Sequence, residues 1–282
     1  MAEKWTEYYT ANQLKGLQRM ELDLLREFIS VCITLHLEYV IYGGTLLGYE
    51  KYGGMIPWDD DIDVALPRES YNKFVRMADK ILPEGYFLQT PYNSKLSPYP
   101  YAKLRKKGTK YVEYINRNLN IETGIYIDIY PIDKIPDNER LRKKQFKKVR
   151  KWILMYVYRQ SRLYDKKEAS IVGKIKNLAK WIICHMTKVF SQKYCVRKID
   201  HYMNMYNDKE TNRYAALNSP NINNIYDGFY PLEQGRFNGI DVWVPANYKE
   251  HLKKRYGDYS KDLPEEERVG HIPYILEMPE NE

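Results

Sequence analysis

The sequence predicts an α+β protein with an inserted helical segment, on three observations. Amphipathic helices and short β-strands alternate over residues 1–137, a basic helical pattern fills most of 138–218, and strand formers return in 219–282. A chain of 282 residues can bury a sizeable core as one large domain with an insertion. We expect 1–137 to form the core, 138–218 a basic insertion or subdomain, and 219–282 a hairpin and helix that complete the core.

The N-terminal part of the core is predicted as helix, strand, glycine turn and helix. Residues 11–37 carry apolar side chains at helical spacing: Leu14, Leu17, Leu24, Phe28 and Cys32. The apolar run at 39–42 is rich in strand formers, and Gly43-Gly44 ends it. Thr45 is expected to cap a short helix that contains Leu46 and Leu47.

Further elements follow from period-2 alternation, proline breaks and turn signals. Pro67 should end a strand that contains 61–64, and a helix over 68–82 is expected to follow. The other predicted strands are 86–89, 101–105, 109–113 and 125–130, the last closed by Pro131. Asn238-Gly239 predicts a two-residue hairpin turn within 236–244, and a closing helix over 246–256 should stop at Gly257.

Composition excludes some classes of protein. Hydrophobic residues make up 44% and charged residues 29% of the chain, as in globular proteins. No run of about 18 apolar residues is present, so a membrane-spanning helix is not expected. The N-terminal MAEKWTEYYT lacks the apolar core of a secretory signal, and the three cysteines have no metal-ligand spacing. Both features predict a reduced, cytoplasmic setting.

The net charge of +8 comes from one segment. Residues 134–198 contain 20 Lys and Arg against 4 Asp and Glu, a local charge of +16, so the rest of the chain carries −8. Basic amphipathic helices over 138–190 are expected either to dock on an anionic membrane surface or to pack on the core with their lysines in water. No nucleic-acid reading module accompanies the charge, so nucleic-acid binding is not expected.

Four acids, Asp59, Asp60, Asp61 and Asp63, crowd directly after Trp58. In a strand, Asp61 and Asp63 point to the same face, where two carboxylates are ligands that Mg²⁺ prefers, with Mn²⁺ as the alternative. A solvated acidic turn is the ordinary interpretation of an isolated pair. Here a glycine turn that suits phosphate lies upstream, and a single acid, Asp128, lies on a later strand. Asp59 or Asp60 is expected to cap a helix or to support the metal ligands.

Four segments of the sequence resemble the LicD family of bacterial phosphocholine transferases, whose relatives include the fukutin-type ribitol-phosphate transferases. They are GGTLLGYEKYGGMIPWDDDIDVALPRESY at 43–71, YPYAKLRKKGTKYVE at 99–113, IYIDIYPID at 125–133 and VPANYKEHLKKRYGDYSKDLPEEERVGH at 244–271. The resemblance implies a nucleotidyltransferase (DNA polymerase beta-like) fold, a mixed sheet flanked by helices. It assigns Gly43, Gly44 and Thr45 to the phosphate turn, Asp61 and Asp63 to the metal pair, and Asp128 to the third acid.

The activity implied by the resemblance is transfer of phosphocholine from CDP-choline to a hydroxyl of a cell-surface glycan precursor, with release of CMP. Teichoic acid, lipopolysaccharide and capsule are the acceptor types expected, and the acceptor is commonly lipid-linked. Asp61 and Asp63 would hold Mg²⁺ on the pyrophosphate. Asp128 would either bind a second metal or accept the proton of the attacking hydroxyl. The enzyme is then expected in the cytoplasm or at the inner face of the cell membrane.

Other residues are assigned supporting roles. Lys103 and Arg105 lie two apart on one strand and are expected to contact phosphate, or else to be solvated edge cations. Arg268 and His271 match a C-terminal family motif, which makes them candidates for phosphate contact or, for His271, catalytic proton transfer. An aromatic choline cage is expected from Trp58, Tyr99 and Tyr101, because a quaternary ammonium is bound by aromatic faces.

Three other functions are consistent with parts of the sequence. A CDP-ribitol or CDP-glycerol donor would keep the chemistry but would require polar contacts in place of the aromatic cage. A non-catalytic membrane-surface scaffold would not need Asp61, Asp63 and Asp128. Nucleotidyl transfer to a sugar phosphate is a minor alternative.

Overall fold

The structure is a computed structural model that describes residues 4–95, 97–121, 123–160 and 171–279. The α-helices are α1 Ala11–Thr34, α2 Gly43–Tyr52, α3 Arg68–Met77, α4 Glu139–Gln160, α5 Ile171–Thr187, α6 Gln192–Met203 and α7 Tyr248–Tyr256. The short 3-10 helices are η1 Lys4–Glu7, η2 Ala78–Lys80, η3 Tyr114–Asn116, η4 Ile222–Asn224 and η5 Glu265–Glu267.

The strands form one large sheet and two small ones. The large sheet contains β1 Val40–Ile41, β2 Asp63–Pro67, β3 Tyr86–Gln89, β4 Ala102–Lys106, β6 Tyr126–Lys134, β7 Arg213–Ala216 and β8 Tyr226–Asp227. The small sheets are the hairpin of β9 Leu232–Phe237 with β10 Ile240–Pro245, and the pair of β5 Lys110–Glu113 with β11 Pro273–Glu277.

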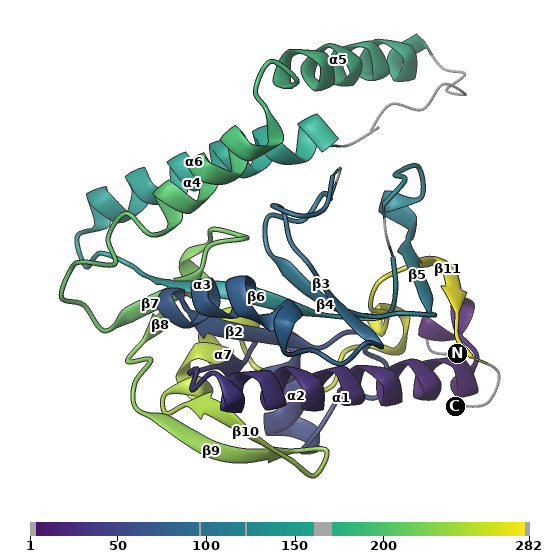
Figure 1. Cartoon of the computed structure of the whole chain (residues 1–282), viewed down its shortest axis with the longest axis vertical. Coiled ribbons are helices and arrows are strands. Elements are labelled where there is room, and N and C mark those ends of the chain that lie inside the picture. Colours follow the sequence, from purple (N-terminus) through teal and green to yellow (C-terminus); the bar gives the residue numbers. More distant parts are fainter. Residues whose placement is uncertain (1–3, 96, 122, 161–170, 280–282) are drawn as a thin grey trace.

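The large sheet is mixed and is flanked by helices, so the fold is α+β (Figure 1). Its order is β1-β2-β6-β4-β3, and β7 extends it by pairing with the far end of β6. Only β2 and β6 pair in parallel, and the other neighbours are antiparallel. This parallel pair sets Asp63 directly opposite Asp128, although 65 positions of sequence separate them.

Helix α1 forms as its apolar spacing predicts. Thr10 and Gln13 form a capping box at its start, which satisfies two backbone N–H groups. Its apolar stripe packs on β4 and β6, with Leu24, Leu25 and Phe28 fully buried. Burial of three such side chains contributes on the order of 5 kcal/mol of stabilisation before entropic costs. The helix holds one face of the sheet in place beneath the acidic segment.

The basic segment folds as α4, α5 and α6 and has its own apolar cluster. Val149 and Tyr156 of α4 pack with Ile199 and Met203 of α6 in that cluster. Within the predicted insertion, β7 pairs with β6 in the large sheet and contributes Ala215 to the same cluster. The helical segment is therefore joined to the sheet through β7.

Several predicted elements are confirmed, and two local details are wrong. Asn238 and Gly239 both take positive φ values, 46° and 77°, as a primed hairpin turn requires, and Gly257 ends α7 at a φ of 72°. The first wrong detail is the end of the strand at 125–130, because β6 does not stop at Pro131 but continues through it to Lys134. Pro131 lies between the stretch paired with β4 and the stretch paired with β7, so its missing N–H falls at a gap between two ladders.

The second wrong detail concerns Thr45, which does not cap α2. The helix begins at Gly43, before Thr45, and the Thr45 hydroxyl instead accepts a hydrogen bond from the backbone N–H of Asp63 at 2.7 Å. The same hydroxyl therefore ties α2 to the first residue of β2. Strand β11, which pairs with β5 near the chain end, was not predicted at all.

Candidate active site

The glycine turn between β1 and α2 is shaped by Asp63. Gly43 has a φ of 60°, and a Cβ built there would lie 2.3 Å from Asp63 Oδ2. The backbone N–H of Tyr42 also donates to the Asp63 carbonyl at 2.9 Å. Glycine is therefore required at this position both for its backbone conformation and for the close approach of the carboxylate.

Three carboxylates meet at the start of β2 and in the middle of β6. One oxygen from each of Asp61, Asp63 and Asp128 lies within 4.8 Å of the others. Asp61 precedes β2, and the register of the parallel pair brings Asp128 beside them. These are the acids that the sequence singled out, and they form a ligand set of the kind that holds a hard divalent cation.

The electrostatics of the three acids are unfavourable without a cation. Burial, together with the charges of Asp61 and Asp128, raises the pKa of Asp63 well above its usual range. Burial also raises the pKa of Asp61 to about 6, although His271 and Lys103 oppose this shift. Asp63 Oδ1 is buried and has no hydrogen-bond partner among the described residues. Such an orphaned acceptor in a carboxylate cluster fits a metal ligand.

Lys103 neutralises part of this charge from the neighbouring strand. The antiparallel register of β4 and β6 sets it opposite Asp128, and its Nζ lies 2.7 Å from Asp128 Oδ1 and 3.7 Å from Glu113 Oε1. Its ammonium also lies 3.4 Å from the ring centre of Tyr126 and 4.0 Å from that of Tyr99. Lys103 is 1% exposed, so the interpretation of it as a solvated edge cation is wrong.

Arg105, two residues further along β4, has different partners. Its Nε donates to Gln89 at 2.9 Å and its Nη1 to the Gly124 carbonyl at 2.7 Å. It is 1% exposed, which also excludes a solvated edge position. These bonds attach β3 and the segment before β6 to the guanidinium, so Arg105 holds the sheet together next to the site.

Asp60 ties the acidic segment to both ends of the chain. Its carboxylate accepts hydrogen bonds from the hydroxyls of Tyr9 (2.5 Å) and Tyr111 (3.0 Å) and from the backbone N–H of His271 (2.8 Å). A Cβ on Gly270 would lie 1.9 Å from Asp60 Oδ1, so this approach requires glycine. Asp60 thus supports the neighbouring Asp61 and fixes where the C-terminal segment crosses it.

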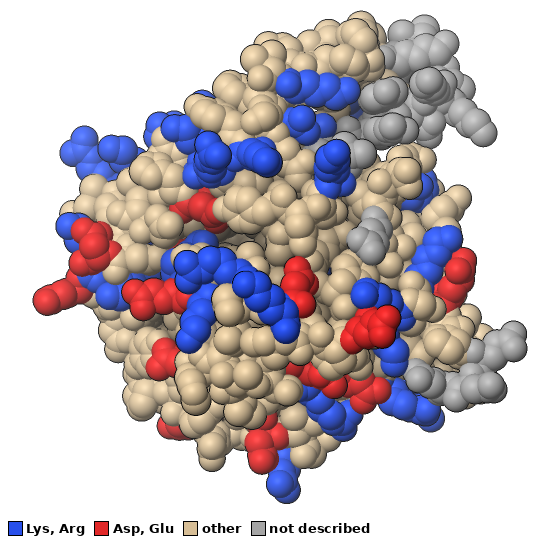
Figure 2. Space-filling model, in the orientation of Figure 1, with Lys and Arg blue, Asp and Glu red and all other residues tan. Residues whose placement is uncertain are grey.

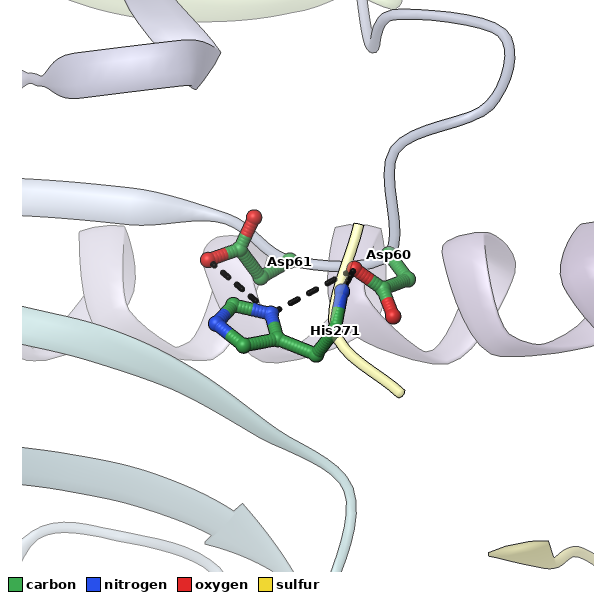
Figure 3. Close-up of side chains that lie close together, drawn as sticks. All are labelled: Asp60, Asp61 and His271. Carbon is green, nitrogen blue, oxygen red and sulfur yellow. Dashed lines mark hydrogen bonds and ion pairs between the residues drawn. The ribbon is translucent and has the colours of Figure 1, made fainter. Parts of the chain in front are cut away.

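His271 is brought to the acids by the pairing of β11 with β5. Figure 3 shows its ring between Asp60 and Asp61, with Nδ1 at 3.4 Å and 3.8 Å from their oxygens. Burial lowers the pKa of His271, but the nearby carboxylates of Asp60 and Asp61 raise it to about 10. This direction favours the cationic form of the ring, which suits contact with phosphate.

The predicted aromatic cage is divided between two places. The ring contacts of Trp58 are with Tyr52 at 6.1 Å and with the guanidinium of Arg268 at 4.6 Å. Tyr99 and Tyr101 instead contact each other at 5.7 Å, close to Lys103. Arg268 therefore lies over Trp58, where its Nε also donates to the Leu263 carbonyl at 2.8 Å.

Two charged residues near the acids were missed by sequence reasoning. Glu113 of β5 accepts hydrogen bonds from Tyr99 (2.6 Å) and Tyr126 (2.9 Å) beside Lys103. Arg255 of α7 lies with its Cζ 5.2 Å from the ring centre of Tyr42, and its charge lowers the pKa of Asp63 against burial. Its Nη1 is buried without a partner among the described residues. The sequence signal for Arg255 was its position in VPANYKEHLKKRYGDY, part of the segment 244–271 that resembles the LicD family.

Comparison with known proteins agrees with this geometry. Residues 36–161 match the family described as LicD/FKTN/FKRP, nucleotidyltransferase domain. Residues 36–161 are therefore similar to the domain of the LicD family. The matched range of this LicD domain includes the glycine turn, all three acids and Lys103, whereas Arg255 and His271 lie outside it.

A full-length relative extends the similarity beyond the LicD domain. The chain is 28% identical over 264 residues to the lipopolysaccharide cholinephosphotransferase LicD of Haemophilus influenzae, a match that covers 92% of this chain and 95% of that protein. Among the described residues, no helix has the length and apolar character needed to cross a membrane.

Proposed function

We propose that this protein transfers phosphocholine from CDP-choline to a hydroxyl of a cell-surface glycan precursor and releases CMP. The observation that carries the proposal is the convergence of Asp61, Asp63 and Asp128 within 4.8 Å in a LicD-family domain. The name of the Haemophilus relative supports choline phosphate as the transferred group and a lipopolysaccharide-type acceptor. A nucleotidyltransferase-type fold is part of the proposal, supported by the order of glycine turn, paired acids and third acid.

Asp61, Asp63 and Asp128 would hold Mg²⁺, with Mn²⁺ as a substitute. When bound, the ion would neutralise the transferring and departing phosphate oxygens. Asp63 Oδ1 supports this assignment, because it is a buried acceptor without a hydrogen-bond partner among the described residues. Lys103, ion-paired to Asp128, would keep that carboxylate oriented towards the other two.

The remaining cations would bind the phosphates of the donor. Arg255 has a buried Nη1 without a hydrogen-bond partner among the described residues, and His271 lies beside Asp61, so the two approach the acids from different elements. The backbone N–H groups at the start of α2, Gly43 and Gly44, offer further donors to an anion. Such fixed donors stabilise charge that develops on phosphate oxygens without reorganisation during the reaction.

The choline group would be recognised by aromatic faces. The ring centres of Tyr99 and Tyr101 lie 4.0 Å and 5.8 Å from the ammonium of Lys103, so a choline group would share these rings with Lys103. Trp58, covered on one side by Arg268, would close the site from the acidic segment.

One assay tests the proposed activity. The purified protein is incubated with Mg²⁺ and CDP-choline, CDP-ribitol or CDP-glycerol, and CMP release is measured with and without a lipopolysaccharide-type or teichoic-acid-type acceptor. We expect release with CDP-choline that depends on acceptor and is abolished by EDTA. If CMP is released only with CDP-ribitol or CDP-glycerol, the transferred group is a polyol phosphate and not phosphocholine. If no donor is turned over with any acceptor, the proposal is refuted.

A further inference from the structure

Helix α5 carries an apolar stripe that faces away from the protein. Four of its residues, Ile175, Leu178, Ile182 and Met186, follow one another at spacings of three and four and are therefore on one side of the helix. Their exposed fractions are 64%, 57%, 43% and 67%. Cys184, which points to the opposite side, is only 1% exposed. The helix is thus packed through its other face and presents its apolar stripe to solvent.

The exposure of this stripe distinguishes the two interpretations of the basic segment, which are docking on a membrane and packing on the core. In α4, the apolar residues Val149 and Tyr156 are fully buried against α6, so packing accounts for them. In α5, no described part of the chain covers the stripe. Figure 1 shows α5 as the outermost element, with the α4 and α6 pair between it and the sheet. Soluble proteins rarely expose such a continuous apolar face unless something binds it.

Positive charge lies beside the stripe, on α4 and on the flank of α5. A cavity of about 790 Å³ lies between α4, α5 and the turn at 220–222, and it is lined by both cationic and apolar side chains. Its cations are Lys143, Lys147, Arg150 and Lys151 of α4. In the view of Figure 2, Lys and Arg predominate over the helices at the top of the molecule. Helix α5 itself contains exposed Lys176 and Lys180 and no acid.

We propose that α5 and the cationic face of α4 form a docking surface for an anionic phospholipid bilayer. The apolar stripe would enter the boundary between headgroups and acyl chains, and the lysines would contact lipid phosphates. A second copy of the chain is the less favourable occupant, because two such faces would oppose lysines without any acid on α5 to neutralise them. The surface goes beyond the proposed reaction and does not depend on it.

Vesicle co-sedimentation tests the surface directly. The full chain is mixed with vesicles of phosphatidylcholine alone or of phosphatidylcholine with phosphatidylglycerol. We expect binding to the anionic vesicles that weakens as salt is raised, and little binding to the neutral ones. Ile182→Glu should weaken binding by at least about tenfold, since it places a charge in the apolar stripe. Absence of wild-type binding to anionic vesicles at low salt would refute the proposal.

The matched control is Ile33→Glu, the same substitution at an exposed position at the end of α1. Ile33 is 68% exposed and lies outside the helical segment, so this variant should bind vesicles as the wild type does. Equal loss of binding in both variants would contradict a specific surface. A lipid-free dimer that Ile182→Glu dissociates, seen by analytical ultracentrifugation, would assign the stripe to a second copy instead. Because these measurements need no substrate, their failure is distinguishable from failure of the proposed reaction.

A fluorescence measurement provides an independent check. Trp181 is 43% exposed on α5, next to the stripe. Anionic vesicles should shift its emission to shorter wavelength as its surroundings become apolar, and Trp181→Phe should remove that shift. An unchanged emission spectrum of the wild type on vesicles would overturn insertion of α5.

Discussion

The acid cluster of the sheet buries charged side chains, whereas the outer face of α5 exposes apolar ones. Both depart from the usual distribution of side chains in a folded protein. In the sheet, Asp61, Asp63 and Asp128 crowd charge into a largely buried place. On α5, Ile182 and its apolar neighbours lie in water although the helix has a packed side. Both arrangements oppose stability. The difference separates the two proposals: a small cation would neutralise the acids, whereas an extended apolar surface would cover the helix.

The largest expected effect comes from replacing one acid. Asp63→Asn should lower CMP release by more than about 10³-fold, because it removes a charged metal ligand. The folded protein should become more stable in EDTA, since the variant removes a buried carboxylate whose pKa is raised. Thermal unfolding with and without Mg²⁺ checks this: the ion should raise the Tm of the wild type and leave that of the variant unchanged.

The control for this variant is Asp241→Asn, on the exposed hairpin, where the side chain is 79% exposed. It should match the wild type in activity and in its response to Mg²⁺. Retained turnover in Asp63→Asn would exclude the metal assignment.

A smaller loss is expected from Arg255. Arg255→Met keeps the length of the side chain but removes the buried Nη1 donor, so CMP release should fall by about 10²-fold. The matched control is Lys253→Met, an exposed cation on the same helix, for which we expect no change. Steady-state kinetics over a range of CDP-choline concentrations measure the effect, and equal losses in the two variants would reject a specific role for Arg255.

The third effect is on pH-dependent stability. His251 is 4% exposed and stacks on Tyr226, and burial followed by the charge of Arg255 lowers its pKa to about 3. The unfolded chain therefore binds a proton below about pH 6.5 while the folded chain does not. Stability is present above that pH and is lost as pH falls towards 3. Between pH 7 and 4 the loss should be roughly 3 kcal/mol.

Urea denaturation at several pH values measures this loss. His251→Phe keeps an aromatic ring against Tyr226 but cannot titrate, so its curve should be flatter by the same roughly 3 kcal/mol. Identical pH profiles for the two proteins would show that His251 does not carry the effect.

The smallest effect is expected on the outer face of α5. Ile182→Glu should change the free energy of unfolding by no more than about 0.5 kcal/mol and leave turnover of a soluble acceptor unchanged. Cys184→Glu, on the packed side of the same helix, should cost about 3 kcal/mol because it buries a charge. Chemical denaturation of both variants checks the comparison. Similar losses from the two substitutions would mean that the stripe is packed after all.

Sequence alone determined the local elements of the site. Period-2 alternation identified Asp61 and Asp63 as a pair, the glycine turn and the strand with Asp128 were recognised, and basic amphipathic helices were predicted over 138–190. These patterns depend on backbone geometry within a few residues, which neighbouring side chains report directly. The similarity to the LicD family then connected the separate pieces.

The tertiary structure alone decided which pieces meet and which way they face. The parallel register opposes Asp63 and Asp128, pairing of β11 with β5 brings His271 to Asp60, and α7 carries Arg255 towards Asp63. Helical periodicity predicts that α5 has an apolar stripe but not whether that stripe is buried. Contacts between distant segments depend on the packing of the whole core. The local sequence therefore predicts neither the counter-ions of the acids nor the exposure of α5.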